Sequence, residues 1–407
     1  MKILRIIARL NVGGPARHVV WLTQALQRDG VESKLIAGTV PEGEEDMSYF
    51  AAEHGVEPIY IREMSRELSV KDAVSLWKVL KAIRSERPDI IHTHTAKAGT
   101  VGRAAAFIYK WFTPGTFVGR PRRVKVVHTF HGHVFHSYYG KRKTQIFVLI
   151  EKILARFASD KIIVITPQQF REIHTEVGVG RKEQFEVIPL GIDLSKFHSD
   201  DTARREFREE FVIPDDTLLI GFVGRLTEIK NIPMLLAAAK IYFESGDAPR
   251  TKFMIVGDGH LRADLEQTAE DLGLKENVIF AGNREDLGRV YAGLDVVALT
   301  SLNEGTPLSV IEAMASRRAV IATLVGGVVD LLGSTEAETD GFAMAERGVG
   351  VASGDAEVFA KGLIYLAKNE RLRFDLGNKG HQFAIKNYGK ERLISDIRSL
   401  YSRLLEE

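Results

Sequence analysis

Short apolar runs alternate with longer amphipathic stretches along most of this chain. An example of the amphipathic pattern is residues 16–30, where apolar positions recur at helical spacing and Gly30 ends the run. Runs that are apolar throughout are typical of strands buried on both faces of a parallel sheet. In the first half these runs predict strands at residues 3–7, 33–37, 58–61, 89–94, 124–130, 161–166 and 185–189.

The same alternation restarts after a highly charged segment at residues 199–211. The repeated pattern predicts α/β architecture with two doubly wound, Rossmann-like domains, spanning residues 1–198 and 199–388, followed by an amphipathic helix at 389–407. Ligands of such sheets bind outside the carboxyl ends of the strands, so the strand-end loops are the places to look for chemistry. In the second half the predicted strands are 218–224, 252–259, 278–282, 296–300, 319–323 and 348–354.

Composition narrows the class of protein. The 407 residues include no cysteine, which excludes disulfides and thiolate metal sites. No apolar run reaches the ~18 residues of a membrane span, and residues 1–10 resemble a first strand rather than a signal peptide. We therefore expect a cytoplasmic protein that can also bind peripherally to the inner face of the cell membrane.

Charge is distributed unevenly along the chain. Residues 1–200 hold 30 Lys and Arg against 21 Asp and Glu, whereas the remainder holds 25 against 33. The window 101–150 contains nine basic residues and no acidic one. Such a patch indicates an anionic partner, or else only a solvated face. With the aromatic run at 107–112, residues 103–143 suggest a membrane-binding surface; the alternative is an ordinary helix with buried aromatics. No nucleic-acid-binding module is recognisable, so we expect no nucleic acid partner.

Residues 303–315 carry two glutamates in an otherwise uncharged stretch. Thr306 is predicted to cap a helix whose first turn contains Pro307. That helix is apolar almost all round, which predicts burial, and a buried carboxylate needs a partner. Glu304 precedes the helix, while Glu312 lies one turn after Ser309. Either both glutamates have internal partners or they hold a ligand at the helix N-terminus.

Other strand-end loops of the second half add cations and glycines. Arg225 and Lys230 follow one strand, before Asn231 as a possible helix cap, and predict an anion site unless both pair with Glu228. Further along, Gly257 and Gly259 form a strand-to-helix turn that permits close backbone approach. Asn283 and Arg284 follow a further strand, where they offer backbone groups to a base edge. The pair Gly326–Gly327 lies in another strand-end loop.

The first half offers a glycine pair and a group of histidines. Gly13 and Gly14 follow the first strand, where their amides can approach a phosphate, but the spacing lacks the Gly-x-Gly-x-x-Gly fingerprint of NAD binding. Six of the twelve histidines lie between residues 92 and 136. No nearby carboxylate or cysteine completes a zinc site, so we expect no metal. His131, just beyond a strand, is the first choice for a functional histidine.

Four segments resemble the donor half of glycosyltransferase family 4, which has the GT-B fold and retains anomeric configuration. They are GRLTEIK (224–230), VGDGHLRADLE (256–266), VIFAGNRED (278–286) and EGTPLSVIEAMA (304–315). The resemblance covers nearly the whole chain. It includes the Gly13–Gly14 loop, the Thr129–Gly132 stretch and a final helix that in the family crosses back to the first domain.

The resemblance implies a role for each matching residue. Arg225 and Lys230 would hold the diphosphate of a nucleotide sugar, Glu312 would accept hydrogen bonds from the ribose, and Glu304 and His131 would lie beside the transferred sugar. The implied catalytic set is His131, Glu304, Arg225 and Lys230. The implied donor-binding set is Gly13, Gly14, Arg225, Lys230, Gly257, Asn283, Arg284, Glu304, Thr306, Leu308, Ser309 and Glu312. Pro307 and Asn231 stand where the family often has glycine.

The chain has no Asp-x-Asp motif, so cations and helix N-termini are expected to replace a metal, and no cofactor is expected. The resemblance favours front-face attack, a UDP-sugar carrying a hexose or N-acetylhexosamine, and surface polysaccharide biosynthesis. Its subgroup builds on polyprenyl-diphosphate carriers, for which Lys97 and Arg103 would supply acceptor contacts. Two alternatives are a GT-B sugar-nucleotide epimerase and a non-catalytic nucleotide-sugar sensor.

Overall fold

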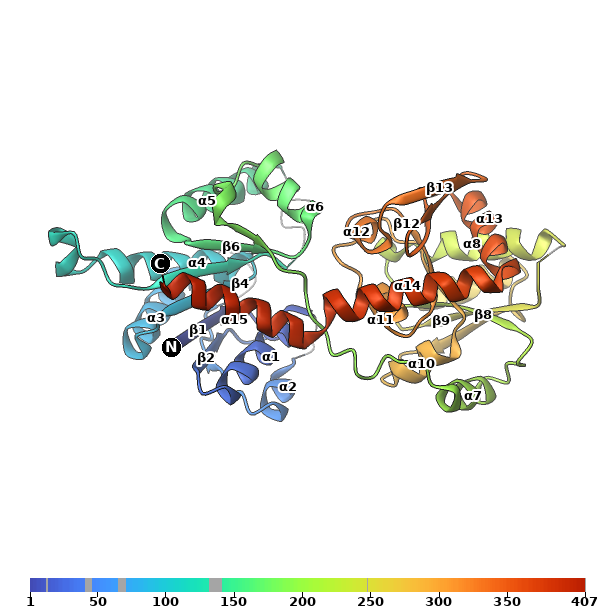
Figure 1. Ribbon diagram of the computed structural model, residues 1–407, viewed down its shortest axis with the longest axis horizontal. Coiled ribbons are helices and arrows are strands. Elements are labelled where there is room, and N and C mark those ends of the chain that lie inside the picture. The colour runs from blue at the N-terminus through green and yellow to red at the C-terminus, as the bar shows by residue number, and fades with distance from the viewer. Residues whose placement is uncertain (12–13, 41–45, 65–70, 132–140, 247, 407) are drawn as a thin grey trace. The chain divides into compact units, whose positions relative to one another are not determined.

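The computed structural model describes residues 1–407 except 12–13, 41–45, 65–70, 132–140, 247 and 407. The chain divides into two compact units. Unit 1 comprises Met1–Ile192 and Lys390–Glu407, and unit 2 comprises Asp193–Gly389. Each unit is an α/β sheet with helices on both faces, parallel throughout in unit 1 and parallel except for β13 and β14 in unit 2, which confirms the predicted doubly wound class (Figure 1). The chain passes from unit 1 to unit 2 a few residues before the expected boundary at residue 198.

Unit 1 contains a seven-stranded sheet in the order β3-β2-β1-β4-β5-β6-β7, with every described pairing parallel. All seven strands predicted from the first half are present. The strands are β1 (Lys2–Ile7), β2 (Glu32–Ala37), β3 (Ile59–Tyr60), β4 (Ile90–His94), β5 (Lys125–Thr129), β6 (Lys161–Val164) and β7 (Phe185–Val187). The helices are α1 (Gly14–Arg28), α2 (Ser48–Glu53), α3 (Lys71–Glu86), α4 (Ala96–Trp111), α5 (Lys141–Ala158), α6 (Pro167–Phe170) and α15 (Lys390–Glu406), with short turns η1 (Pro114–Val118), η2 (Arg171–Glu176) and η3 (Lys182–Gln184).

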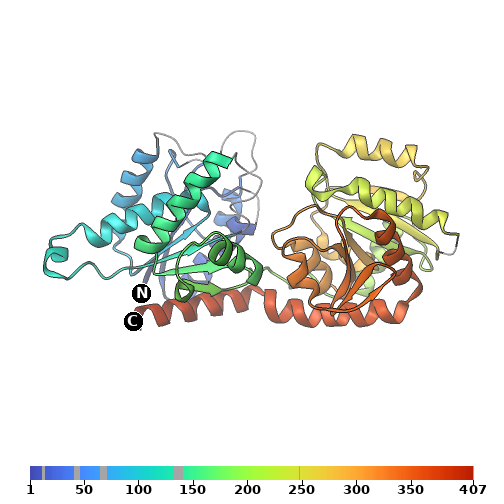
Figure 2. The same ribbon diagram turned by 90° about the horizontal axis from the view of Figure 1, so that it is seen from above.

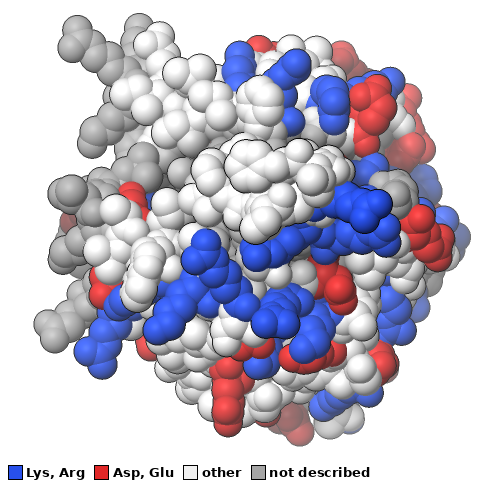
Figure 3. Space-filling model, turned by 90° about the vertical axis from the view of Figure 1, so that its left-hand side faces the viewer, with Lys and Arg blue, Asp and Glu red and all other residues white. Residues whose placement is uncertain are grey.

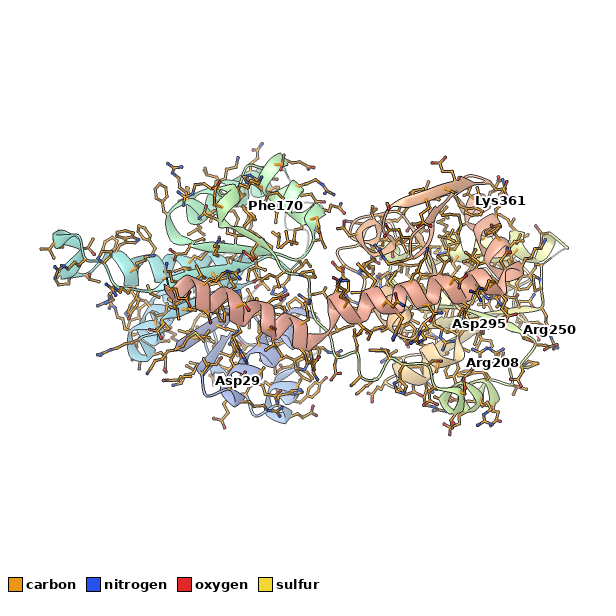
Figure 4. All side chains as sticks on the ribbon, in the orientation of Figure 1. Asp29, Phe170, Arg208, Arg250, Asp295 and Lys361 are labelled. Atoms are coloured by element: carbon orange, nitrogen blue, oxygen red, sulfur yellow. The ribbon has the colours of Figure 1, made fainter. Side chains whose placement is uncertain are left out.

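Both faces of this sheet are buried, as the continuous apolar strands require. Leu4 of β1 packs with α3 and α4 on one face, while its neighbour Ile3 packs with α1 and α15 on the other. Figure 2 shows α15 along the side of the sheet opposite α4. Leu400 and Tyr401 of α15 are fully buried in that second core, so the C-terminal helix is part of unit 1. An ion pair between Asp29, labelled in Figure 4, and Arg398 secures it at the surface.

Unit 2 contains an eight-stranded sheet in the order β10-β9-β8-β11-β12-β15-β14-β13. The strands are β8 (Leu218–Val223), β9 (Thr251–Val256), β10 (Val278–Gly282), β11 (Val296–Leu299), β12 (Ala319–Thr323), β13 (Thr335–Thr339), β14 (Phe342–Ala345) and β15 (Gly348–Val351). The helices are α7 (Asp201–Glu210), α8 (Ile232–Glu244), α9 (Arg262–Asp271), α10 (Leu287–Gly293), α11 (Leu308–Ala315), α12 (Val328–Leu332), α13 (Ala356–Lys368) and α14 (Glu370–Tyr388), with the short turn η4 (Glu228–Lys230).

The first helix of unit 2, α7, is fixed by buried charge. Arg208 is almost fully buried, and its guanidinium lies 3.3 Å from Oδ2 of Asp295, the residue before β11 (Figure 4). Arg204 reaches the other carboxylate oxygen of Asp295 at 2.7 Å. A carboxylate shared by two guanidiniums is strongly held. The charged segment predicted from the sequence as a domain junction is therefore anchored to the sheet of unit 2.

Among the parallel strands of each sheet the order reverses between β1 and β4 in unit 1 and between β8 and β11 in unit 2. On either side of such a switch point the connecting helices go to opposite faces of the sheet. The loops beyond the carboxyl ends of the two central strands therefore diverge and leave room for a ligand. This topology selects the loops after β8 and β11, and those after β1 and β4, as the places where a site can form.

Candidate active site

The loops that follow β8 and β11 are joined by their backbones at the switch point of unit 2. Leu302 N donates to Ile229 O at 2.8 Å, and Thr300 Oγ1 donates to Lys230 O at 3.1 Å. These two bonds fix the carbonyl of Lys230 and the chain just before Glu304 in one arrangement. Residues predicted separately from two strand ends are thereby brought together.

An ion pair lies at the centre of this junction. Lys230 Nζ is 2.5 Å from Glu304 Oε1, and Ser301 Oγ donates to the same oxygen at 2.6 Å. The two charged side chains are only 20% and 10% exposed. The Arg225 side chain is exposed and makes no hydrogen bond or ion pair with any described residue. The alternative in which both cations pair with Glu228 is wrong, because Glu228 instead contacts His260 at 2.8 Å.

Glycines let neighbouring loops touch at this edge of the sheet. A Cβ on Gly326 would overlap the carbonyl oxygen of Glu304, and one on Gly327 would overlap that of Gly305. Gly327 N also donates to Gly305 O at 2.8 Å. Gly257 lies equally close to the backbone of Gly224, with φ +132°. Gly326 and Gly327 therefore allow the backbone packing that holds the Glu304 loop in place, and Gly257 does the same for the end of β8.

The helix after Glu304 begins one residue later than the sequence predicted. Its N-cap is Pro307, with φ −70° and ψ 116°, and α11 starts at Leu308. Pro307 has no N–H and an extended ψ, so it occupies the cap, and Thr306 Oγ1 has no hydrogen-bond partner among the described residues. The side-chain cap predicted for Asn231 is also wrong. Asn231 is the N-cap of α8, but it adopts a left-handed conformation without a side-chain cap bond.

Glu312 lies on the buried side of α11. It is 9% exposed, and Tyr291 OH donates to its Oε2 at 2.9 Å. Burial is the main cause, and the nearby Glu312 charge the second, that raises the pKa of Tyr291 well above its usual value. The phenol therefore remains the donor. Both glutamates of the 303–315 stretch therefore have internal partners. Leu308 and Ser309, at the start of the same helix, are partly exposed.

Asn283 and Arg284 follow β10, as predicted, but the Arg284 side chain is committed elsewhere. It lies 2.7 Å from Asp286 Oδ2 and 2.5 Å from Glu210 Oε1. Hydrogen bonds to these two carboxylates raise the pKa of Arg284 above its ordinary value. A ligand at this loop would meet backbone groups rather than the guanidinium.

In unit 1, histidines gather at the carboxyl ends of β4 and β5. His94 Nδ1 lies 2.9 Å from His131 Nε2, and the rings of His94 and His92 are 4.1 Å apart. Burial lowers the pKa of His131 to about 4, so its ring is neutral at pH 7. Gly14 begins α1, whereas Gly13, His133 and His136 lie outside the described residues.

Two further residues complete this polar region and were missed by sequence reasoning. His18 is buried on α1, with its ring centroid 4.8 Å from that of His131. Tyr401 of α15 places its hydroxyl 2.6 Å from His92 Nδ1. The only available signal for His18 was its place on the first helix after the glycine pair. Tyr401 gave none, because it lies on the apolar stripe of a terminal helix.

The two residues predicted to contact the acceptor are both engaged inside unit 1. Lys97 is 5% exposed and forms an ion pair with Asp72. Arg103 is fully buried, lies 2.6 Å from both carboxylate oxygens of Glu151, and donates from Nε to Gly99 O at 2.8 Å. A guanidinium paired with a carboxylate in this way stabilises the contact between α4 and α5. The structure therefore argues against Arg103 as a ligand for phosphate.

Comparison with known families agrees with this arrangement in both halves. Residues 12–196 match "Glycosyltransferase Family 4", and residues 203–383 match "Glycosyl transferases group 1". The chain is a family 4 glycosyltransferase of the GT-B type. Among the helices that the structure describes, none is long and apolar enough to cross a bilayer.

The chain is similar to several named proteins along most of its length. It is 28% identical over 349 residues, 85% of its length and 84% of the relative's, to the UDP-Gal:alpha-D-GlcNAc-diphosphoundecaprenol alpha-1,3-galactosyltransferase of Escherichia coli. It is 26% identical over 355 residues, 86% of each protein, to the capsular polysaccharide biosynthesis glycosyltransferase CapM of Staphylococcus aureus. Anabaena HepE, solved in complex with UDP, shares the fold with a TM-score of 0.79 at 19% identity, covering 99% of this chain and 100% of HepE.

Gly326→Ala tests the glycine packing behind Glu304. The new Cβ would overlap Glu304 O at a residue with φ +51°, and the combined strain should cost at least about 2 kcal/mol. Calorimetry should show the unfolding temperature of unit 2 fall by roughly 4–8 °C. Gly305→Ala is the matched control, because its Cβ meets no atom within 4 Å. An equal effect of the two substitutions would contradict the close approach.

Proposed function

We propose that this glycosyltransferase transfers a hexose or N-acetylhexosamine from a UDP-sugar, with retention of anomeric configuration, to a polyprenyl-diphosphate-linked glycan in surface polysaccharide synthesis. The observation that carries the donor half of this proposal is the Lys230–Glu304 pair beside the exposed Arg225 at the switch point of unit 2. The acceptor half is supported by the names of the Escherichia coli and Staphylococcus aureus relatives.

In this proposal Arg225 and Lys230 hold the diphosphate. Cleavage of the bond to the sugar builds negative charge on the departing phosphate, which fixed positive groups stabilise. Each charge-assisted hydrogen bond contributes roughly 1.5–3 kcal/mol. The backbone amides at the start of α11, which has no side-chain cap, add about 0.3–1 kcal/mol for a nearby anion. Together these groups are strong enough to support departure without a metal ion, and we propose that none is required.

Glu304 binds the sugar rather than forming a covalent bond to it. Its Oε1 already accepts from Lys230 and Ser301, which holds the carboxylate in one orientation, and carboxylate oxygens accept hydrogen bonds from sugar hydroxyls. For the transfer itself, the acceptor oxygen attacks the anomeric carbon on the face from which the diphosphate leaves. The bond from that carbon to the phosphate oxygen breaks as the new glycosidic bond forms. The acceptor proton passes to the departing phosphate oxygen.

The roles of Glu312 and His131 follow from their neighbours. Glu312 would accept from ribose hydroxyls while retaining the hydrogen bond from Tyr291. His131 would lie beside the transferred sugar as a neutral ring, since burial lowers its pKa to about 4. A neutral imidazole orients a hydroxyl by hydrogen bonding, because one ring nitrogen donates and the other accepts.

Donor binding is tested by thermal shift of the full chain with UDP-, GDP- and ADP-sugars, with and without EDTA. We expect the UDP-sugar to stabilise the protein most, equally in EDTA, because stabilisation grows with the ratio of ligand to Kd. Lys230→Met should weaken UDP binding roughly 10- to 100-fold, since it removes one charge-assisted bond. The control is Lys240→Met, whose exposed ammonium lies 3.7 Å from Glu244. Loss of the shift in EDTA would contradict metal-free binding.

Glu304→Gln tests the assignment of that carboxylate. The amide keeps the shape but loses the charge, so we expect donor binding to persist in calorimetric titration while kcat falls. Product release with donor alone should remain negligible, which separates transfer from epimerisation. A glycosyl adduct at Glu304, detected by mass spectrometry of the wild-type protein after incubation with donor, would show that it acts as a nucleophile.

We also propose that the protein binds the anionic face of a membrane through the tip of unit 1. At the end of α4 and in η1, Phe112, Phe117 and Val118 are 71%, 93% and 72% exposed. The nearby Arg120 and Arg123 are exposed as well. Figure 3 views this end of unit 1 and shows an uncharged projection bordered by Lys and Arg. Large exposed apolar side chains rimmed by cations favour an anionic lipid surface.

Sedimentation with vesicles tests this surface. Burial of one Phe contributes about 1.5–3 kcal/mol, so Phe117→Ser should lower the partition coefficient onto anionic vesicles by roughly 10- to 100-fold. Added salt should weaken binding of the wild-type protein, because screening reduces attraction by Arg120 and Arg123. Phe374→Ser, at an aromatic residue that is 61% exposed on unit 2, is the control. Binding that ignores lipid charge, or equal effects of both variants, would remove the proposal.

A further inference from the structure

Three imidazoles converge at the switch point of unit 1. His18 lies on α1 after β1, His94 ends β4, and His131 follows β5. One nitrogen from each ring lies within 4.8 Å of one nitrogen from each of the others. The ring centroids are 4.8 Å apart for His18 and His131, 5.5 Å for His18 and His94, and 5.2 Å for His94 and His131. Side chains from three separate strand ends thus meet where this topology leaves space for a ligand.

The hydrogen bonding within the cluster is incomplete. His18 is 5% exposed, yet neither of its ring nitrogens has a hydrogen-bond partner among the described residues. His94 is fully buried, and its Nδ1 faces His131 Nε2 at 2.9 Å inside the cluster. Leaving a buried ring nitrogen such as those of His18 unsatisfied costs about 1–3 kcal/mol. The neighbouring His92 differs, because Tyr401 OH lies 2.6 Å from one of its nitrogens and Thr129 Oγ1 2.7 Å from the other.

We propose that His18, His94 and His131 bind one divalent transition-metal ion, with Zn²⁺ as the preferred class, and leave a fourth position for water or another ligand. Neutral imidazole is a common ligand of zinc, copper, nickel and iron, and three histidines with one open position are a known zinc arrangement. The open position lies toward His131, the only one of the three that is partly exposed. The sequence predicted no metal because no carboxylate or cysteine lies near the histidines of residues 92–136. In the structure the third ligand is instead a histidine of α1.

The geometry requires only small side-chain adjustments. Zinc–nitrogen bonds of ~2.0–2.1 Å place the ligand nitrogens of a tetrahedral site roughly 3.4 Å apart. His94 Nδ1 and His131 Nε2 are already 2.9 Å apart, so His18 has to approach them by rotation of its ring. The His92 ring, 4.1 Å from His94 and itself held by Tyr401 and Thr129, fixes the orientation of the His94 ring.

This metal site is distinct from the proposed diphosphate site, although it shares His131 with the proposed sugar contact. The diphosphate is assigned to Arg225 and Lys230 of unit 2, whereas the three histidines belong to unit 1. The ion is given no role in departure of the phosphate. Metal content and diphosphate binding in EDTA are therefore independent measurements, and either the metal site or the assignment of the diphosphate to Arg225 and Lys230 can fail while the other stands.

The test is a cobalt titration of untagged, full-length protein that has first been stripped with a chelator. We expect the intense visible absorption of four-coordinate Co²⁺ to reach a plateau at one ion per chain and to disappear when Zn²⁺ is added. His18→Leu should remove the absorption. The same variant, freed of two unsatisfied nitrogens, should unfold at the same or a higher temperature than the stripped wild-type protein. Zn²⁺ should raise the unfolding temperature of the wild-type protein and not that of His18→Leu.

Two further variants make the outcome decisive. Loss of an outer-shell partner costs ~10- to 100-fold in metal affinity. His94→Gln removes a ligand itself, so it should weaken Co²⁺ binding by at least that factor. His198→Ala, at a histidine whose side chain is 63% exposed on unit 2, should leave the titration unchanged. The absence of a four-coordinate spectrum in the wild-type protein would overturn the proposal. Persistence of that spectrum in His18→Leu, or its loss in His198→Ala, would do the same.

Discussion

The ion pair between Lys230 and Glu304 joins the loops that follow the two central strands of unit 2. Lys230 is the cation that would meet a diphosphate, and Glu304 is the carboxylate that would meet a sugar. The ion pair holds Lys230 Nζ 2.5 Å from Glu304 Oε1. The pair depends on backbone packing around it, since Gly326 allows the neighbouring loop to lie against Glu304. Loops from β8, β11 and β12 thus support one small group of charges. This group lies at the strand-order reversal, where the loops leave room for a ligand, and not in the hydrophobic core.

Unit 1 repeats the topology with different chemistry. Its switch point carries imidazoles, and behind them lies a buried polar layer that extends to the C-terminal helix. Arg5 is fully buried, and its described hydrogen bonds go to Thr23, Ser33 and Tyr401, with no carboxylate among them. Tyr401 also contacts His92. The terminal helix therefore does more than cover apolar surface, because it supplies a hydroxyl on which the order of the histidine layer depends.

Much of the fold could be predicted because buried parallel strands are apolar throughout. The strands now labelled β1 to β12 and β15 were all predicted from that feature. The hairpin β13–β14 was missed, since Thr335–Thr339 is polar and mostly exposed at the edge of the sheet. An edge strand needs no apolar run and is often charged, so it gave no signal.

The candidate site was predictable where chemistry lies in one short stretch, and less so where partners come from distant segments. Glu304, Glu312, Arg225 and Lys230 were found because unusual charges follow apolar strands. The sequence did not show which charges pair with one another. Arg103 looked like a free cation, but its partner Glu151 lies on the next helix and takes both of its charge-assisted bonds. His18 looked like one more position on an amphipathic helix, and only the fold places it beside His94 and His131.

The central claim is that protein cations at the β8–β11 junction hold the departing diphosphate. A crystal structure of the full chain with UDP, grown with a divalent cation present, tests this most directly. The account predicts phosphate oxygens within hydrogen-bond distance of Lys230 Nζ and the Arg225 guanidinium, with the ribose hydroxyls at Glu312. Phosphates bound away from both cations, or linked to the protein through a metal ion, would contradict it.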